Sequence, residues 1–193
     1  FADSSQIPTL LLCREARKHV TVALTGDGGD EIFGGYNRHV LAPKLWSRAS
    51  RVPSVARFGG SLFGKFLSSR SDKFVQKVSG LVGVSPSVFK KAARFGQIIG
   101  NSTSLDQVYF GLTRHCDHPS QFLRINLSHT EADERHEFEH LEPAERLMAL
   151  DSVGYLPSDI LVKVDRAAMN ASLETRAPFL DARTVCAAWS LDL

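Results

Sequence analysis

The sequence predicts a mostly α-helical chain that contains one or few parallel strands. An apolar run rich in β-branched residues, at positions 20–24, is typical of a fully buried strand. The rest of the chain shows helical periodicity, divided by prolines and capping residues, and no other convincing strand pattern. Because one strand cannot form a sheet, we expect its partner strands to lie upstream, outside this chain.

The predicted strand leads directly into a glycine-rich loop. The loop, at residues 25–29, reads TGDGG, and a short helix is expected to begin at Asp30. Asp30 and Glu31 would occupy the first turn of that helix, where negative side chains interact favourably with the helix dipole. A further helix, over residues 10–19, is expected to precede the strand.

A strand, a glycine loop and a helix start in this order are typical of phosphate binding, because the loop can present backbone N–H groups to the anion. Gly26, Gly28 and Gly29 would allow close approach and positive φ angles. The carboxylates of Asp27 and Asp30 would repel a bare phosphate, so a phosphate site here implies Mg²⁺. The same composition also occurs in ordinary turns. A calcium-binding loop is the less favoured interpretation, because the regular alternation of oxygen ligands and the distant bidentate Glu are missing.

Helical patterns continue to the end of the chain. Pro43 and Pro53 predict helix starts, followed by segments at 44–51 and 54–67. Later helices are expected at 72–81, 86–95, 105–115 and 119–127. A longer helical region is predicted over 143–173, with an interruption near residues 154–157, and the last helix is expected at 179–191.

The composition limits the classes of protein to which the chain can belong. The chain has 193 residues, 43% of them hydrophobic, and a formal net charge of +2, which is too small to favour nucleic acid or an anionic membrane as a partner. No apolar run is long enough to span a bilayer. Cys13, Cys116 and Cys186 are widely spaced, so we expect three reduced thiols rather than a zinc site or a disulfide framework. The missing initiator Met suggests an excised fragment.

A second group of charged residues lies near the C-terminus. Asp159 precedes Lys163 by four residues, so the two side chains can pair on one helix face. Glu174 and Arg176 follow shortly before Pro178. One interpretation is an ion-pair network that locks helices together, involving Arg166, Glu174, Arg176 and Asp181. The other is a cleft wall that offers charges to an acidic or zwitterionic substrate, with Lys163 as its best candidate.

Together, the glycine-rich loop with its flanking residues and the charged segment near the C-terminus resemble the asparagine synthetase family. TGDGGDEIFGGYNRH is similar to the family's pyrophosphate loop, usually close to SG(D/E)GxDE-hydrophobe-FGGY, and YLPSDILVKVDRAAMNASLETRAPFLDARTV is similar to its later helical signature. FADSSQIPT resembles the segment before the last sheet strand. The resemblance implies a partial synthetase domain, 1–193, of the α/β adenine nucleotide alpha-hydrolase-like type with a PP-loop. It would comprise the last αβ unit (1–41), a variable helical region (42–142) and the signature region (143–193).

The resemblance implies a carbon–nitrogen ligase of asparagine biosynthesis. In that family a carboxylate, usually aspartate, attacks the α-phosphorus of ATP, and ammonia from a glutaminase domain displaces AMP from the acyl-adenylate. Thr25, Gly26, Gly28 and Gly29 match the ATP-binding loop, and Asp30 matches the carboxylate that holds Mg²⁺ against pyrophosphate. Asp27 matches an acid tied to the adenylate. Asp159 and Lys163 are further candidates for catalysis, and Glu174 is a candidate for substrate binding.

Departures from the family pattern limit what this chain can do. Thr25 replaces the usual Ser, and Asp27 is shorter than the Glu of some members, which leaves the substrate open. The family's SGGxDS loop, its N-terminal glutaminase and its later lysine-bearing loop lie outside the chain. We therefore expect the polypeptide alone to be inactive. We expect its parent to be a cytoplasmic enzyme that works with a glutaminase domain. A homodimeric parent is compatible with the sequence.

Two alternatives stay open. A sister activity in the same family would amidate a sugar acid, a peptide carboxylate or a β-amino acid, or close a β-lactam. An alternative of another class is a non-catalytic helical interaction module, for which the basic segment 38–70 is a candidate. No nucleic acid or membrane partner is expected.

Overall fold

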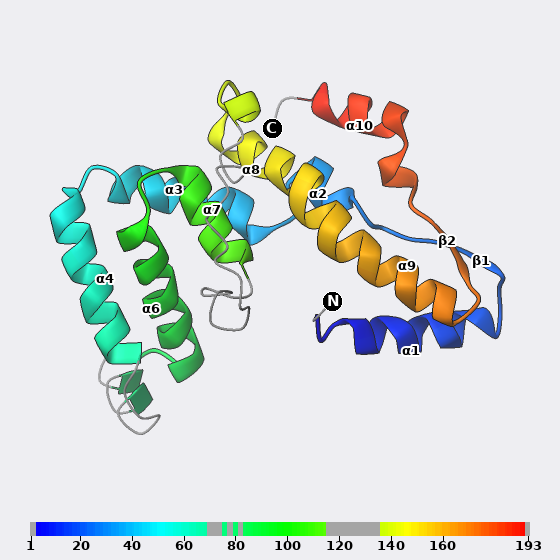
Figure 1. Ribbon diagram of the computed structural model, residues 1–193, viewed down its shortest axis with the longest axis horizontal. Coiled ribbons are helices and arrows are strands. Elements are labelled where there is room, and N and C mark those ends of the chain that lie inside the picture. Colours follow the sequence, from blue (N-terminus) through cyan, green and yellow to red (C-terminus); the bar gives the residue numbers. More distant parts are fainter. Residues whose placement is uncertain (1–2, 69–74, 77–78, 81–82, 115–135, 192–193) are drawn as a thin grey trace, which may run out of the picture. The chain divides into compact units, whose positions relative to one another are not determined.

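The computed structural model describes residues 3–68, 75–76, 79–80, 83–114 and 136–191. The chain divides into two compact units, one formed by residues 1–40 and 135–193 and the other by residues 41–134. Helices dominate both units, and two short parallel strands lie in the first (Figure 1). The predicted class, mostly α with few parallel strands, is confirmed.

The first unit begins with α1 (Gln6–Arg17), which packs against α9 (Leu161–Asn170), as Figure 1 shows. Their shared core includes Cys13, Ala167, Ala168 and Leu173. Small residues at this contact allow the two helices to approach closely. Cys13 is a free thiol in this core, and Cys186 is a free, exposed thiol; Cys116 lies outside the described residues.

The sheet differs from the prediction in two ways. Strand β1 (Val22–Leu24) pairs in parallel with β2 (Glu174–Arg176), so one partner strand lies downstream within this chain. The sequence ETR has no apolar alternation, and the strand forms because main-chain hydrogen bonds pair it with β1. β1 is also not fully buried in the described structure, since Val22 is 47% and Leu24 75% exposed. That further strands lie upstream stays a prediction.

After β1 come α2 (Gly29–Phe33) and α3 (Asn37–Ala49), which crosses from the first unit into the second. Pro43 lies inside α3, so the predicted helix start there is wrong: Asn37 already begins the helix. α2 packs against α8 (Pro143–Leu150). A capping box formed by Glu142 and Glu145 begins α8.

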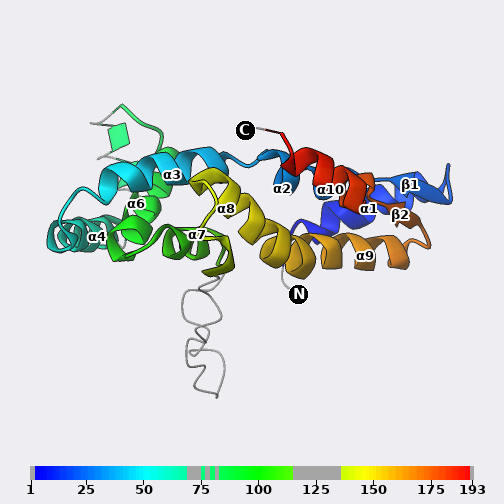
Figure 2. The ribbon, with the colours of Figure 1, turned by 90° about the horizontal axis from the view of Figure 1, so that it is seen from above.

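The helical region after Pro143 continues without a break into α9. The intervening segment η4 (Asp151–Ile160) is π-helical, and Figure 2 shows α8 and α9 as parts of one continuous helical ribbon that bends between them. Pro157 lies within η4. Because proline lacks an N–H and its ring clashes with the carbonyl four residues earlier in an α-helix, wider turns accommodate it. The interruption predicted near residues 154–157 is therefore a change of helix type.

The C-terminal signature ends in a short 3₁₀ turn, η5 (Pro178–Leu180), followed by α10 (Ala182–Trp189). The side chain of Asp181 accepts a hydrogen bond from the backbone N–H of Arg183 and so caps α10. The helix thus begins three residues later than predicted. A short 3₁₀ turn, η3 (His136–Phe138), precedes α8.

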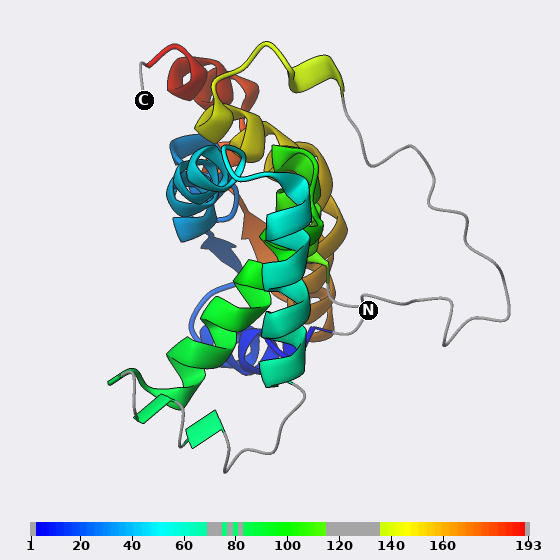
Figure 3. The same ribbon diagram turned by 90° about the vertical axis from the view of Figure 1, so that its left-hand side faces the viewer.

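In the second unit, α4 (Ser54–Ser68) packs along α6 (Pro86–Asn101), which is visible in Figure 3. A Cβ on Gly100 would meet the main chain at Arg57, so glycine permits this close contact. α7 (Leu105–Thr113) follows, capped by Ser104. The starts predicted after Pro53 and Ser85 are confirmed. The helix predicted at 119–127, and most of the one at 72–81, lie outside the described residues.

Candidate functional site

The glycine loop lies at the carboxyl end of β1. The backbone N–H of Thr25 donates to the carbonyl of Arg176 at 2.8 Å, which continues the strand pairing to the edge of the loop. Gly28 has a φ of 90° and directly precedes α2. Because ligands of open α/β sheets bind outside the carboxyl ends of the strands, the loop has the correct position for a binding site.

The structure brings the C-terminal signature segment into contact with this loop. Leu180 packs on Gly28, where a Cβ would collide with its side chain, and Phe179 lies over Gly29. The Phe179 ring also meets Phe33 edge to face, with 5.9 Å between ring centroids. The PFL segment after β2 therefore supports the loop, and Gly28 and Gly29 have a packing reason to be glycine. Gly26 differs, since no atom of the described residues lies within 4 Å of its Cβ position.

Several hydrogen-bonding groups of the loop have no protein partner. Within the described part of the chain, no group accepts from the N–H of Gly26, Asp27 or Gly28. The Thr25 hydroxyl oxygen is buried and also lacks a partner there. Buried polar groups are normally satisfied. Three successive N–H groups and an orphaned hydroxyl are a donor set that suits a phosphate.

Two carboxylates flank these donors. Asp27 is half-buried and Asp30 is exposed, on the first turn of α2. Asp30 is held against the chain at Gly35, where a Cβ would collide with its carboxylate. The described residues include no group of three metal-binding side chains. A single exposed carboxylate beside phosphate donors still fits Mg²⁺, which usually binds through one or two carboxylates, phosphates and water.

Lys163 does not pair with Asp159, contrary to the sequence prediction. Its ammonium donates instead to Asp3, at 3.1 Å, and joins α9 to the residues before α1. The pKa of Asp3 is lowered to about 2, first by hydrogen bonds from Ser5 and then by Lys163. Asp159 lies in η4 with one carboxylate oxygen buried and unpartnered within the described chain.

Glu174 lies apart from the glycine loop. It opens β2 opposite Val22, whereas the loop follows Leu24 at the other end of the pair. Its carboxylate pairs with Arg176 on the same strand. Asp181 similarly pairs with Arg183, two residues away. These ion pairs are local and exposed, so the predicted network that locks helices together through Glu174, Arg176 and Asp181 is wrong.

A buried polar cluster beside α2 was not predicted. Asp151, at the start of η4, accepts a hydrogen bond from Arg38 Nε, forms an ion pair with the same guanidinium and contacts His39, and all three side chains are largely buried. Tyr36 and Tyr155 lie against Arg38. The available signal was an aspartate within the apolar run LMALDSVGYL, since a charge on a buried helix face needs a partner.

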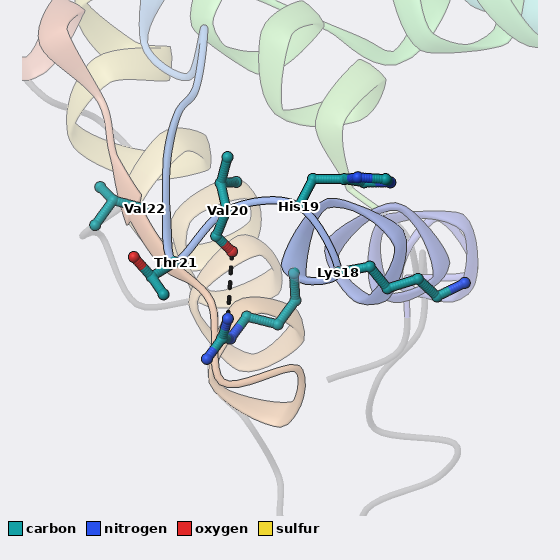
Figure 4. Close-up of a pocket in the computed structure, with 6 residues that line it drawn as sticks. Lys18, His19, Val20, Thr21 and Val22 are labelled. Atoms are coloured by element: carbon teal, nitrogen blue, oxygen red, sulfur yellow. Dashed lines mark hydrogen bonds between the residues drawn. The ribbon is translucent and has the colours of Figure 1, made fainter.

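A shallow depression lies at the opposite end of β1, lined by residues 17–22 (Figure 4). Figure 4 shows Lys18 and His19 pointing to one side and Thr21 and Val22 to the other, so the side chains do not converge. The side chain of Arg17 donates to the carbonyl of Val20 at 3.5 Å. This depression lies at the amino end of the strand, away from the loop donors.

Comparisons with known proteins agree on one family. The sequence model of the family described as asparagine synthase matches residues 1–193. Asparagine synthetase (glutamine-hydrolyzing) 1 of Bacillus subtilis is 31% identical over 94% of this chain and 26% of its own length. A protein of Mycobacterium bovis, provisionally named asparagine synthetase (glutamine-hydrolyzing), is 29% identical over 93% of the chain and 25% of its own length.

A third relative, from Methanocaldococcus jannaschii and provisionally named asparagine synthetase (glutamine-hydrolyzing) 2, is 58% identical over 61 residues, or 32% of the chain. The chain spans about a quarter of the length of the first two relatives. No solved structure matches. In the described residues, no helix combines the length and apolar character that crossing a membrane requires.

Proposed function

Because this chain belongs to the asparagine synthase family, whose domain is of the PP-loop adenine nucleotide alpha-hydrolase type, we propose that it forms part of an ATP-dependent amidotransferase. The reaction converts a carboxylate, aspartate, to an amide with glutamine-derived ammonia and yields asparagine, AMP and pyrophosphate. A glutaminase domain supplies the ammonia, and the enzyme acts in the cytoplasm. The observation that carries the proposal is the set of donors at the carboxyl end of β1 that have no partner in the described part of the chain, beside the exposed Asp30.

In this proposal, the N–H groups of Gly26, Asp27 and Gly28 and the Thr25 hydroxyl bind the pyrophosphate portion of ATP. Gly26 supports this role because its Cβ position is open, so a ligand can approach the main chain. Asp30 is the residue that would hold Mg²⁺, which supplies charge neutralisation for the departing pyrophosphate. Asp27, half-buried beside these donors, is the acid that we assign to forming or using the adenylate.

We assign Asp159 and Lys163 to the same site; Asp159 lies in η4, which packs against α2, and Lys163 follows in α9. Lys163 would offer positive charge to the developing phosphate charge, and its bond to Asp3 holds the ammonium in place. The Asp159 carboxylate, one oxygen of which has no partner among the described residues, suits a cationic or hydroxyl group of the substrate. Glu174 is a substrate-binding residue only if the substrate reaches the amino end of β2.

The decisive experiment measures ATP–pyrophosphate exchange by the complete protein that contains this chain. We expect exchange that depends on aspartate and Mg²⁺, and its loss in Asp30→Asn. Exchange with another carboxylate but not with aspartate would favour the sister activity. Unchanged biological function in Asp30→Ala would favour a non-catalytic interaction module. The 193 residues alone are expected to show no turnover, and pyrophosphate release by them would contradict that expectation.

A second variant tests the geometry of Asp30 without removing its charge. Gly35→Ala places a methyl group where the Asp30 carboxylate lies, so the carboxylate must move. We expect the Mg²⁺ concentration needed for half-maximal exchange to rise. Gly26→Ala is the matched change, because it adds the same methyl group in open space. It should leave the Mg²⁺ requirement unchanged and weaken only the binding of ATP.

A further inference from the structure

The buried cluster around Asp151 joins the start of α3, which follows α2, to the start of η4. Arg38 Nε donates to Asp151 Oδ2 at 2.8 Å, and His39 Nε2 lies 2.6 Å from the same oxygen. Asp151 is fully buried and His39 is 1% exposed. Arg38 and His39 open α3, and Asp151 opens η4, so the contact joins segments more than 100 positions apart.

Aromatic rings extend this cluster back to α2. The Arg38 guanidinium stacks 3.9 Å from the Tyr36 ring centroid and 4.8 Å from that of Tyr155. The Tyr36 hydroxyl donates to Glu31 Oε1 at 2.8 Å, and Glu31 is buried within α2. Burial and then the Glu31 carboxylate raise the pKa of Tyr36, so the phenol stays protonated and can donate this bond. A series of contacts therefore leads from Asp151 to the residue next to Asp30.

The same helix carries the other proposed site residues. Tyr155 and Asp159 follow Asp151 at intervals of four within η4, and Lys163 comes four residues later in α9. Burial, followed by the nearby Asp159 carboxylate, raises the pKa of the Tyr155 phenol. The cluster thus connects α2, which carries Asp30, to the continuous helix that carries Asp159 and Lys163.

A buried ion pair is a poor source of net stability, since desolvation offsets most of the attraction between the charges. Its directional hydrogen bonds do fix the relative position of the segments that it joins. Catalytic groups held on two separate segments need such a constraint, because a displacement of about 1 Å can lower a rate about 100-fold.

We propose that Asp151 is a positioning residue that holds the glycine loop in register with Asp159 and Lys163, acting through Arg38, His39 and Tyr36. The role rests on the proposed function of the loop. Asp151 does not touch the substrate. Its loss should therefore lower the turnover number for pyrophosphate exchange more than it raises the KM for ATP, since the phosphate donors of the loop remain in place.

The test compares two variants of the complete protein at a temperature where both are folded. Asp151→Asn weakens the hydrogen bonds to Arg38 and His39. Leu156→Ala truncates a buried apolar side chain of the same segment and lowers stability, while every polar and aromatic side chain of the cluster is kept. We expect turnover to fall about 10- to 100-fold in Asp151→Asn and to stay within about threefold of wild type in Leu156→Ala. Hydrogen exchange of the α2 amides should accelerate only in Asp151→Asn.

The outcomes separate the two proposals. A wild-type protein that exchanges pyrophosphate, together with equal turnover and equal α2 exchange in both variants, would overturn the positioning role and leave the proposed function intact. A wild-type protein without exchange on any carboxylate would overturn the proposed function and the positioning role with it. Loss of turnover in Asp151→Asn that Asp151→Glu partly restores would support positioning, because Glu keeps the charge and the acceptors.

Discussion

Gly28→Ala tests why the glycine loop contains glycine at this position. The backbone there has a φ of 90°, and alanine in the left-handed region costs about 1–2 kcal/mol. The new methyl group would also collide with the Leu180 side chain, and overpacking of this kind costs about 1–3 kcal/mol. The free energy of unfolding of the first unit should therefore fall by about 2–5 kcal/mol.

The assay is urea unfolding of the 193-residue chain, followed by the fluorescence of Trp189, which lies in the first unit. Replacing Trp46 by Phe removes the only other tryptophan. Gly26→Ala is the control, because its added methyl meets nothing, and its effect should stay within about 0.5 kcal/mol. Equal destabilisation by the two substitutions would refute the reasoning, because neither the backbone angle nor Leu180 would then distinguish them.

Three further predictions follow from the described contacts. Phe179→Ala should lower the free energy of unfolding by about 1–3 kcal/mol in the same assay, since it removes the edge-to-face contact at the loop; no loss would contradict that packing. The Asp3 carboxylate has a folded-state pKa of about 2, below its ordinary 3.8, so its stabilising contribution is present above pH 4 and is lost as the pH falls through 2. Asp3→Asn should flatten that part of an acid-unfolding curve, and an unchanged curve would exclude the contacts of this carboxylate with Ser5 and Lys163 as a source of stability. Burial raises the pKa of the Cys13 thiol, so an alkylating reagent at pH 8 should modify exposed Cys186 first and Cys13 only after unfolding, as peptide mass spectrometry would show; equal rates would contradict this burial.

Local patterns in the sequence were sufficient for much of the helical structure. Ser85 followed by Pro86 marks the start of α6, and the hydroxyl of Ser85 accepts from the N–H of Val88 as an N-cap should. The glycine loop was also placed correctly, between a strand and a short helix. These features depend on residues that are close together in the chain, so a short stretch of sequence is enough to predict them.

Tertiary contacts decided structural features that a short stretch of neighbouring residues does not encode. The strand partner of β1 is a charged segment that reads ETR, and Lys163 pairs with Asp3 rather than with the helical neighbour Asp159. Periodicity shows that a helix has an apolar face or a charge to satisfy, but it does not show which distant segment covers it.

By itself, therefore, the sequence determined the family, the glycine loop and most helix starts, because each is written in a short contiguous pattern. Only the tertiary structure showed that Gly28 and Gly29 are covered by the PFL turn while Gly26 stays open, and that Asp151 joins Arg38 and His39. The physical reason is that packing and buried charge pairing depend on segments brought together by the fold, at sequence separations where local preferences carry no signal.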